Sequence, residues 1–199
     1  MSDQNHTKFD ELYYKAMEER PEQFIPASMP FIKCRINGIN LIALIDSGSM
    51  ITCTNLEIAQ KCDLISEMDP RVKVPIMGVG NKVSIGQNYG INIQLGDREI
   101  VIPMLIVDIS FNECDMIIGL DLLRSFRANL DFQNNKLVLN SLGSTFSTNI
   151  LSDNDKKQFL QIRKLIEVSN GRVDEDGAFA YLLKHNFDFD ASLLDIVSS

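Results

Sequence analysis

The stretch LIALIDSGS, residues 41–49, decides the fold of this chain. Five apolar residues that form a strand run directly into Asp46. A carboxylate at the end of a buried strand is costly unless something stabilises its charge or shares its proton. Gly48 lets the backbone turn sharply two residues later. Taken alone, Asp-Ser-Gly is a common turn tripeptide, so a plain strand-to-turn aspartate is the default interpretation.

A second apolar stretch, DMIIGLDLL at residues 115–123, changes that interpretation. Here a strand ends at Gly119 and a short helix follows. Over residues 31–140, β-branched runs alternate with turn residues, and Asn37-Gly38, just before the first stretch, is a strong hairpin signal. Many short strands with regular turns and few helices predict a mainly β barrel or sandwich.

This arrangement resembles a retroviral-type (retropepsin-like) aspartic protease monomer. The resemblance implies that Asp46 is catalytic and that the glycine-bearing segment midway between the motifs is a flap over the substrate. It assigns the other positions to three groups: the active-site loop Ser47, Gly48 and Ser49; the flap Met77, Gly78, Val79 and Gly80; and the bracing segment Ile117, Ile118 and Gly119.

The closer resemblance is to the eukaryotic DNA-damage-inducible family of ubiquitin-linked proteases, and it covers about residues 13–142. It rests on an ordered set of segments: AMEE at 16–19, PEQF at 21–24, DSG at 46–48, MGVG at 77–80, IGLDLL at 118–123 and NLD at 129–131. The family implies an endopeptidase that acts on protein substrates in the ubiquitin–proteasome pathway and needs no cofactor. Only about 30 residues precede the protease region, so we expect no N-terminal ubiquitin-like domain of the kind usual in the family.

The stoichiometry of the motif predicts a homodimer. Acid proteolysis of this kind needs two carboxylates about 3 Å apart that share one proton. The chain has one Asp-Ser-Gly, and a domain of about 110 residues is half the size of a two-lobed aspartic protease. We therefore expect Asp46 of each subunit to face its mate across a two-fold axis.

Other segments flank the protease domain predicted over residues 31–142. An apolar stripe within residues 8–19 predicts an N-terminal helical arm over 1–30, either a docking arm or a cover for a barrel edge. Residues 143–152 are rich in Ser and Thr and predict a linker. Residues 153–199 predict a three-helix bundle that resembles a divergent ubiquitin-associated domain. That resemblance suggests four ubiquitin-binding residues: Val168, Ser169, Leu193 and Leu194.

Composition excludes several classes of protein. The net charge is −8 with no cluster of Lys or Arg, which disfavours nucleic acid as a partner. No apolar run approaches the length of a membrane span, and no secretory signal is evident, so we expect a cytoplasmic or nuclear protein with reduced thiols. The four cysteines and two histidines lack zinc spacing, so no metal site is expected.

Two functions remain open from the sequence. The first is a dimeric aspartic endopeptidase that uses Asp46. The second is a non-catalytic dimeric adaptor that uses the protease fold as a scaffold and presents two C-terminal bundles to ubiquitin or ubiquitinated proteins.

Overall fold

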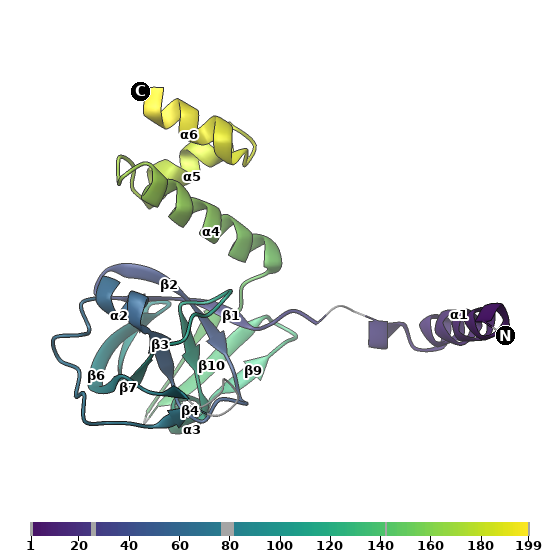
Figure 1. Ribbon diagram of the computed structural model, residues 1–199, viewed down its shortest axis with the longest axis horizontal. Coiled ribbons are helices and arrows are strands. Elements are labelled where there is room, and N and C mark those ends of the chain that lie inside the picture. Colours follow the sequence, from purple (N-terminus) through teal and green to yellow (C-terminus); the bar gives the residue numbers. More distant parts are fainter. Residues whose placement is uncertain (1, 25–26, 77–81, 142, 199) are drawn as a thin grey trace.

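The computed structural model describes residues 2–24, 27–76, 82–141 and 143–198 (Figure 1). Along the chain come an N-terminal helix, a β barrel and three C-terminal helices. In the described part of the chain, no helix combines the length and apolar character that a membrane span requires.

The barrel is closed, with the strand order β1-β2-β8-β3-β7-β6. Its strands are β1 (Phe31–Ile36), β2 (Ile39–Ile45), β3 (Cys53–Asn55), β6 (Gly86–Leu95), β7 (Arg98–Val107) and β8 (Met116–Ile118). Two short helices, α2 (Leu56–Lys61) and α3 (Leu120–Ser125), follow β3 and β8. The predicted mainly β barrel is confirmed. Between α2 and β6, the short strands β4 (Pro75–Ile76) and β5 (Lys82–Val83) pair with each other.

The β1–β2 hairpin turns at Asn37 and Gly38, whose φ angles of 48° and 81° are both positive. Two consecutive positive φ values are the requirement of the tightest hairpin turn, which Asn-Gly satisfies with little strain. The turn fixes the antiparallel register that pairs Ile36 with Ile39 and Phe31 with Leu44. It therefore also fixes where β2 ends, immediately before Asp46.

Strand β2 is apolar on both of its faces. Leu41, Ala43 and Ile45 point into the main barrel core, whereas Ile42 belongs to a second buried cluster outside the barrel. Ile42 is fully buried there, because a residue of the C-terminal helices, Phe159, covers it. A strand buried on both faces reads as a continuous apolar run, as LIALI does.

A three-stranded sheet with the order β11-β10-β9 completes the β region. It consists of β9 (Asn129–Asp131), β10 (Lys136–Ser141) and β11 (Ser144–Asn149). The linker predicted over 143–152 is therefore wrong for residues 144–149, which pair with β10 along its whole length. Ile150 directly after β11 forms a β-bridge with Ile32. The threonines of β11 are compatible with a strand, because Thr favours strands despite its polar side chain. The β region thus extends about eight residues beyond the predicted boundary.

Three helices follow: α4 (Asp153–Val168), α5 (Glu175–Lys184) and α6 (Phe189–Ser198). We refer to them together as the helical unit. Their shared core contains Ile162, Leu165, Ala178, Leu182 and Ile196. Ser152 caps α4 in a reciprocal capping box with Asp155. Ala178 and Leu182 fill the core face of α5, and Phe179 and Leu183 beside them are exposed.

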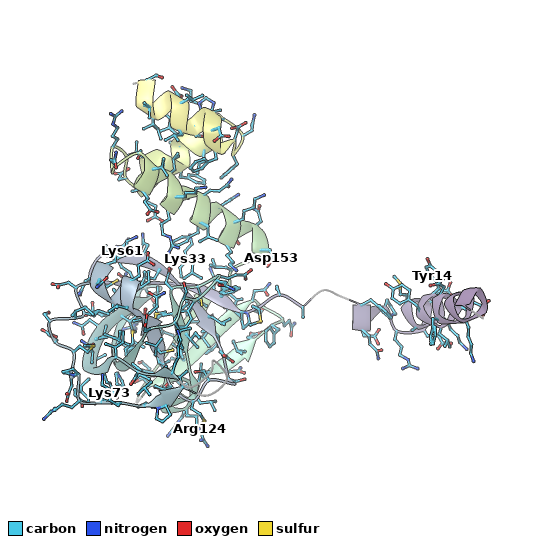
Figure 2. The ribbon with its side chains drawn as sticks, in the orientation of Figure 1. Tyr14, Lys33, Lys61, Lys73, Arg124 and Asp153 are labelled. Atoms are coloured by element: carbon cyan, nitrogen blue, oxygen red, sulfur yellow. The ribbon has the colours of Figure 1, made fainter. Side chains whose placement is uncertain are left out.

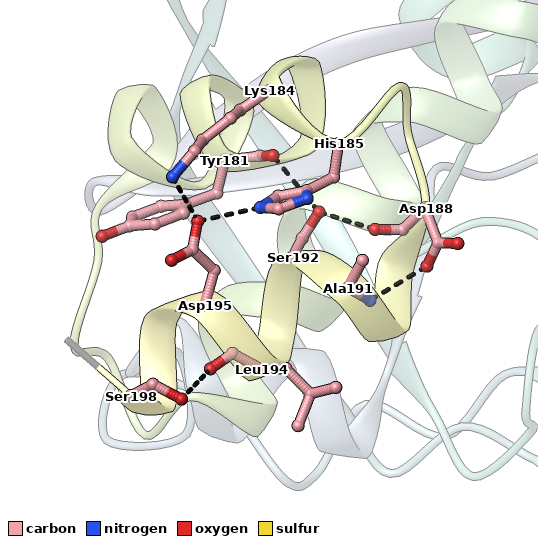
Figure 3. A network of polar contacts seen from close by, with 9 residues as sticks. All are labelled: Tyr181, Lys184, His185, Asp188, Ala191, Ser192, Leu194, Asp195 and Ser198. Atoms are coloured by element: carbon pink, nitrogen blue, oxygen red, sulfur yellow. Dashed lines mark hydrogen bonds and ion pairs between the residues drawn. The ribbon is translucent and has the colours of Figure 1, made fainter.

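The helical unit carries a polar network that joins α5 to α6 (Figure 3). The Asp195 carboxylate accepts hydrogen bonds from Lys184 and pairs with His185, at 2.6 and 2.8 Å. The Ser192 hydroxyl donates to the Asp188 and Tyr181 carbonyls. These contacts fasten the last helix to the end of the preceding one.

The N-terminal helix α1 spans Ser2–Glu19, and the 3-10 helix η1 (Pro21–Phe24) follows it. Its apolar stripe is not covered, since Phe9, Leu12 and Tyr13 are all more than half exposed. Figure 1 shows α1 lying apart from the barrel. The helix therefore does not cover a barrel edge within this chain.

Candidate active site

Asp46 lies at the point where β2 leaves the barrel. Its backbone N–H donates to the Ile118 carbonyl at 3.0 Å, which extends the parallel β2–β8 pairing of Ile45 with Ile118 by one bond. The side chain of Asp46 is half-buried, and Ser47 and Gly48 beyond it are exposed. The fold thus presents a carboxylate at the rim of the barrel on a fixed backbone.

The Asp-Ser-Gly turn orients this carboxylate. The Gly48 N–H donates to Asp46 Oδ1 at 2.8 Å, and the Ser49 N–H donates to the Asp46 carbonyl at 3.1 Å. A Cβ at Gly48 would lie 3.1 Å from Asp46 Oδ1, which is a tight contact. One carboxylate oxygen is thereby held by the turn.

Gly119 allows the bracing segment to approach the active-site loop closely. A Cβ at Gly119 would lie 2.7 Å from the Ile51 backbone carbon, too close for any side chain. The Gly119 N–H donates to the Thr52 hydroxyl at 3.1 Å. Of the other bracing residues, Ile118 is fully buried in the barrel core and Ile117 is half-buried, in register with Leu44.

Asp121 and Thr52 form a polar clamp under the loop that the sequence did not reveal. Asp121 Oδ1 accepts from the Thr52 hydroxyl at 2.7 Å and from the Thr52 N–H at 2.9 Å. The same oxygen accepts from the Leu122 N–H at 2.7 Å. Local sequence patterns do not reveal this pairing, because Thr52 and Asp121 are 69 residues apart. An Asp two residues after the apolar-apolar-Gly segment was the available signal.

Two more hydrogen bonds join the loop to α3. The Leu120 N–H donates to the Ser49 carbonyl at 2.8 Å, and the Asp121 N–H donates to the Met50 carbonyl at 3.2 Å. The first residues of α3 therefore fix the backbone of the loop at Ser49 and Met50. Preorganised loops of this kind keep a reacting group in place at no cost during the reaction.

Cys53 lies close to this clamp. Burial, together with the neighbouring Cys114, Asp121 and Asp46, raises the pKa of the Cys53 thiol to about 12. The thiol is therefore neutral at physiological pH and adds no negative charge beside Asp46.

Comparison with known proteins matches the aspartyl protease family model over residues 21–131. The DNA damage-inducible protein 1 of Yarrowia lipolytica is 32% identical over 137 residues, which are 69% of this chain and 34% of that protein. The chain belongs to the DNA-damage-inducible family of retropepsin-like aspartyl proteases.

Another relative and one solved structure support the same assignment. The UBA domain-containing protein Mud1 of Schizosaccharomyces pombe is 34% identical over 122 residues, which are 61% of this chain and 36% of that protein. The retroviral protease-like domain of Ddi1 from Leishmania major superposes with a TM-score of 0.56 at 25% identity, covering 65% of this chain and 99% of that domain. The chain spans about a third of the length of the curated family members it matches.

The flap predicted for this family member, Met77, Gly78, Val79 and Gly80, lies outside the described residues. The strands on either side of it are described. β4 and β5 pair antiparallel, with Pro75 opposite Val83 and Ile76 opposite Lys82.

The four candidate ubiquitin-binding residues of this family member fall in different environments. Val168 and Leu194 are 47% and 69% exposed. Leu193 packs half-buried against the core of the helical unit. Ser169 is buried, and its hydroxyl donates to the Ile166 carbonyl at the end of α4. Of the four, only Val168 and Leu194 are therefore available to a partner.

Val197 on α6 is also 55% exposed, although it is not among the four predicted contact residues. Arg172 of the α4–α5 loop donates to the Val197 carbonyl at 3.4 Å, which brings that loop to the end of α6. Among the described residues, no group of three or more His, Cys, Asp or Glu side chains is placed to hold a metal ion.

Proposed function

We propose that this chain is an aspartic endopeptidase that works as a homodimer. The observation that carries the proposal is the Asp46 carboxylate, half-buried at the barrel rim and fixed through one oxygen by the Gly48 N–H. Each chain supplies one such carboxylate in an Asp-Ser-Gly turn, so a second copy must supply the other.

The chemistry follows from bringing two such carboxylates within about 3 Å. Like charges this close cannot both ionise, so the pair holds one proton between them. The ionised carboxylate takes a proton from a water molecule that attacks the scissile carbonyl, and the protonated carboxylate polarises the carbonyl oxygen. The two groups titrate as a unit, so apparent pKa values belong to the pair. Protein substrates would lie extended between the subunits, with their backbone paired to strands of the enzyme.

The decisive test compares Asp46→Asn with Asp97→Asn, which removes an exposed carboxylate from the β6–β7 turn. Cleavage of a peptide library by the dimer should fall by about 10²–10⁴-fold for Asp46→Asn, the usual contribution of general acid–base catalysis. It should be unchanged for Asp97→Asn. Sedimentation should show the same dimer for both variants. Equal cleavage by Asp46→Asn and the unaltered chain would rule out this mechanism.

A second candidate function is supported by the exposed apolar residues Val168, Leu194 and Val197 at one end of the helical unit. A family member carries a UBA domain in its name. A non-catalytic dimer could then hold ubiquitin chains by avidity through two weak sites.

Titration of the full chain with ubiquitin, followed by backbone amide shifts, tests this adaptor function. The Val168 and Leu194 amides should move, and Leu194→Asp should abolish the shifts. Leu183→Asp changes an equally apolar, 58% exposed residue on α5 and serves as the matched control. Loss of binding in both variants, or no shift at all, would exclude a defined ubiquitin site here.

A further inference from the structure

The helical unit is seated on the outer wall of the barrel, directly behind β2. Phe159 of α4 is 3% exposed and packs with Phe31 and Ile42 in one buried cluster. Lys33, labelled at the barrel surface in Figure 2, reaches over the Phe159 ring at 5.1 Å from its centroid. Asn40 at the start of β2 donates a hydrogen bond to Glu175 of α5.

An ion pair between a buried carboxylate and a half-buried guanidinium lies within this contact. Asp115, 5% exposed, precedes β8, and its Oδ2 atom accepts from Arg163 Nη1 of α4 at 2.5 Å. The same oxygen accepts from the Ile42 N–H of β2 at 2.8 Å. The Asp115 N–H donates to the Ile42 carbonyl, also at 2.8 Å. Removing the arginine would leave a buried carboxylate without its counter-charge, which proteins tolerate poorly.

The position of this pair relative to Asp46 gives it a role beyond attachment. Asp115 joins Ile42 at the beginning of the parallel β2–β8 pairing. Asp46, four residues after Ile42 and directly beyond the end of β2, joins Ile118 at the other end of the same pairing. That separation is about 13 Å at the usual rise of a strand. Arg163 therefore contacts the beginning of the β2–β8 pair, and Asp46 and Gly119 lie directly beyond the other end of these two strands.

We propose that Arg163 is a positioning residue for Asp46, which it influences from the helical unit through Asp115 and the β2–β8 pair. The inference rests on the proposed protease function. It makes α4 a structural part of the active site, so that the helical unit and the carboxylate pair are mechanically connected.

The test uses the full chain and compares Arg163→Met with Lys157→Met, which removes a cation from the exposed side of the same helix. The first measurement is amide hydrogen exchange at Ile42, at Asp46 and, as an internal reference, at Ile93 in β6. In Arg163→Met, exchange at Ile42 and Asp46 should speed up about tenfold more than at Ile93, because only local openings of the β2–β8 pair are affected. Lys157→Met should leave all three unchanged.

The second measurement is peptide cleavage at a concentration where the dimer is complete. Arg163→Met should lower kcat by about tenfold with little change in KM, because small misplacements of a reacting group cost rate rather than binding. Arg163→Lys, which keeps the charge, should recover part of the loss. An unchanged kcat in Arg163→Met would overturn the proposal, as would equal acceleration of exchange at all three amides or unchanged exchange at Asp46. If the unaltered chain cleaves nothing, the protease function fails, and the exchange pattern alone decides whether Arg163 controls Asp46.

Discussion

The Thr52 hydroxyl donates to Asp121 Oδ1 at 2.7 Å and accepts from the Gly119 N–H at 3.1 Å, which makes this threonine the link between the active-site loop and its brace. Thr52 is fully buried, so neither bond can be replaced by solvent. The loop that carries Asp46 is therefore supported by a hydroxyl group six residues beyond the carboxylate.

Thr52→Val should destabilise the barrel by about 1–3 kcal/mol, because it leaves the Gly119 N–H buried without an acceptor and removes a donor from Asp121. Urea unfolding gives the free energy directly. Thr145→Val removes an exposed hydroxyl that donates to Asn140 and should change stability by less than about 0.5 kcal/mol. A similar decrease in the free energy of unfolding for the two variants would show that the Thr52–Asp121 clamp contributes no more to stability than an exposed hydroxyl.

Gly119→Ala should cost about 1–3 kcal/mol of stability, because the new methyl group would meet the Ile51 backbone at 2.7 Å and the loop must shift. Gly90→Ala in β6 is the matched control, since its Cβ would meet only a Val101 methyl at an ordinary 3.5 Å. Thermal unfolding of both variants checks the comparison. If peptide cleavage is established, Gly119→Ala should also lower kcat, and Gly90→Ala should not.

The native thiols should resist alkylation at pH 8. Burial raises the pKa of Cys62 and Cys114 to about 11 and that of Cys53 to about 12, and it raises the pKa of Cys34 well above its usual range. Since only the thiolate reacts, iodoacetamide should label the folded chain at least about 100-fold more slowly than the chain in urea. Rapid labelling of Cys53 in the folded state would contradict the burial of this thiol.

The α5–α6 joint should weaken in acid. Hydrogen bonds from Lys184 and His185 lower the pKa of the Asp195 carboxyl below its ordinary value. A carboxylate with a lowered folded pKa contributes stability that is complete above its unfolded pKa, about 3.9, and is lost as the pH falls through the folded value. Amide-resolved unfolding of α6 between pH 6 and pH 2 should show this loss. Asp195→Asn should be less stable at pH 6 and should lack that part of the acid dependence, whereas Asp97→Asn should keep it.

Local sequence signals predicted the barrel well where neighbours in sequence are neighbours in space. Asn37-Gly38 sets a two-residue turn, and the turn alone fixes the β1–β2 register. Asn55 caps α2 by accepting the Ile58 N–H, a contact between residues three apart in sequence. Thr54 lies buried in β3, with its hydroxyl donating to the Asp115 carbonyl.

The features that failed prediction depend on contacts between distant residues. β11 contains Ser and Thr without charges, a composition that a linker shares, and only its pairing with β10 distinguishes the two. The Asp121–Thr52 clamp and the Arg163–Asp115 pair join residues 69 and 48 positions apart. The outward-facing Ile42 did carry a signal, because a strand that is apolar on both faces requires a cover on its outer side.

The passage from the barrel into α4 contains almost no slack. Leu151 still donates a backbone hydrogen bond to Phe31 at 2.7 Å, Ser152 is already the helix cap, and α4 begins at Asp153. A swinging tether needs several unrestrained residues, and this junction has at most one. A protein bound by the helical unit would therefore be held in one fixed orientation relative to Asp46.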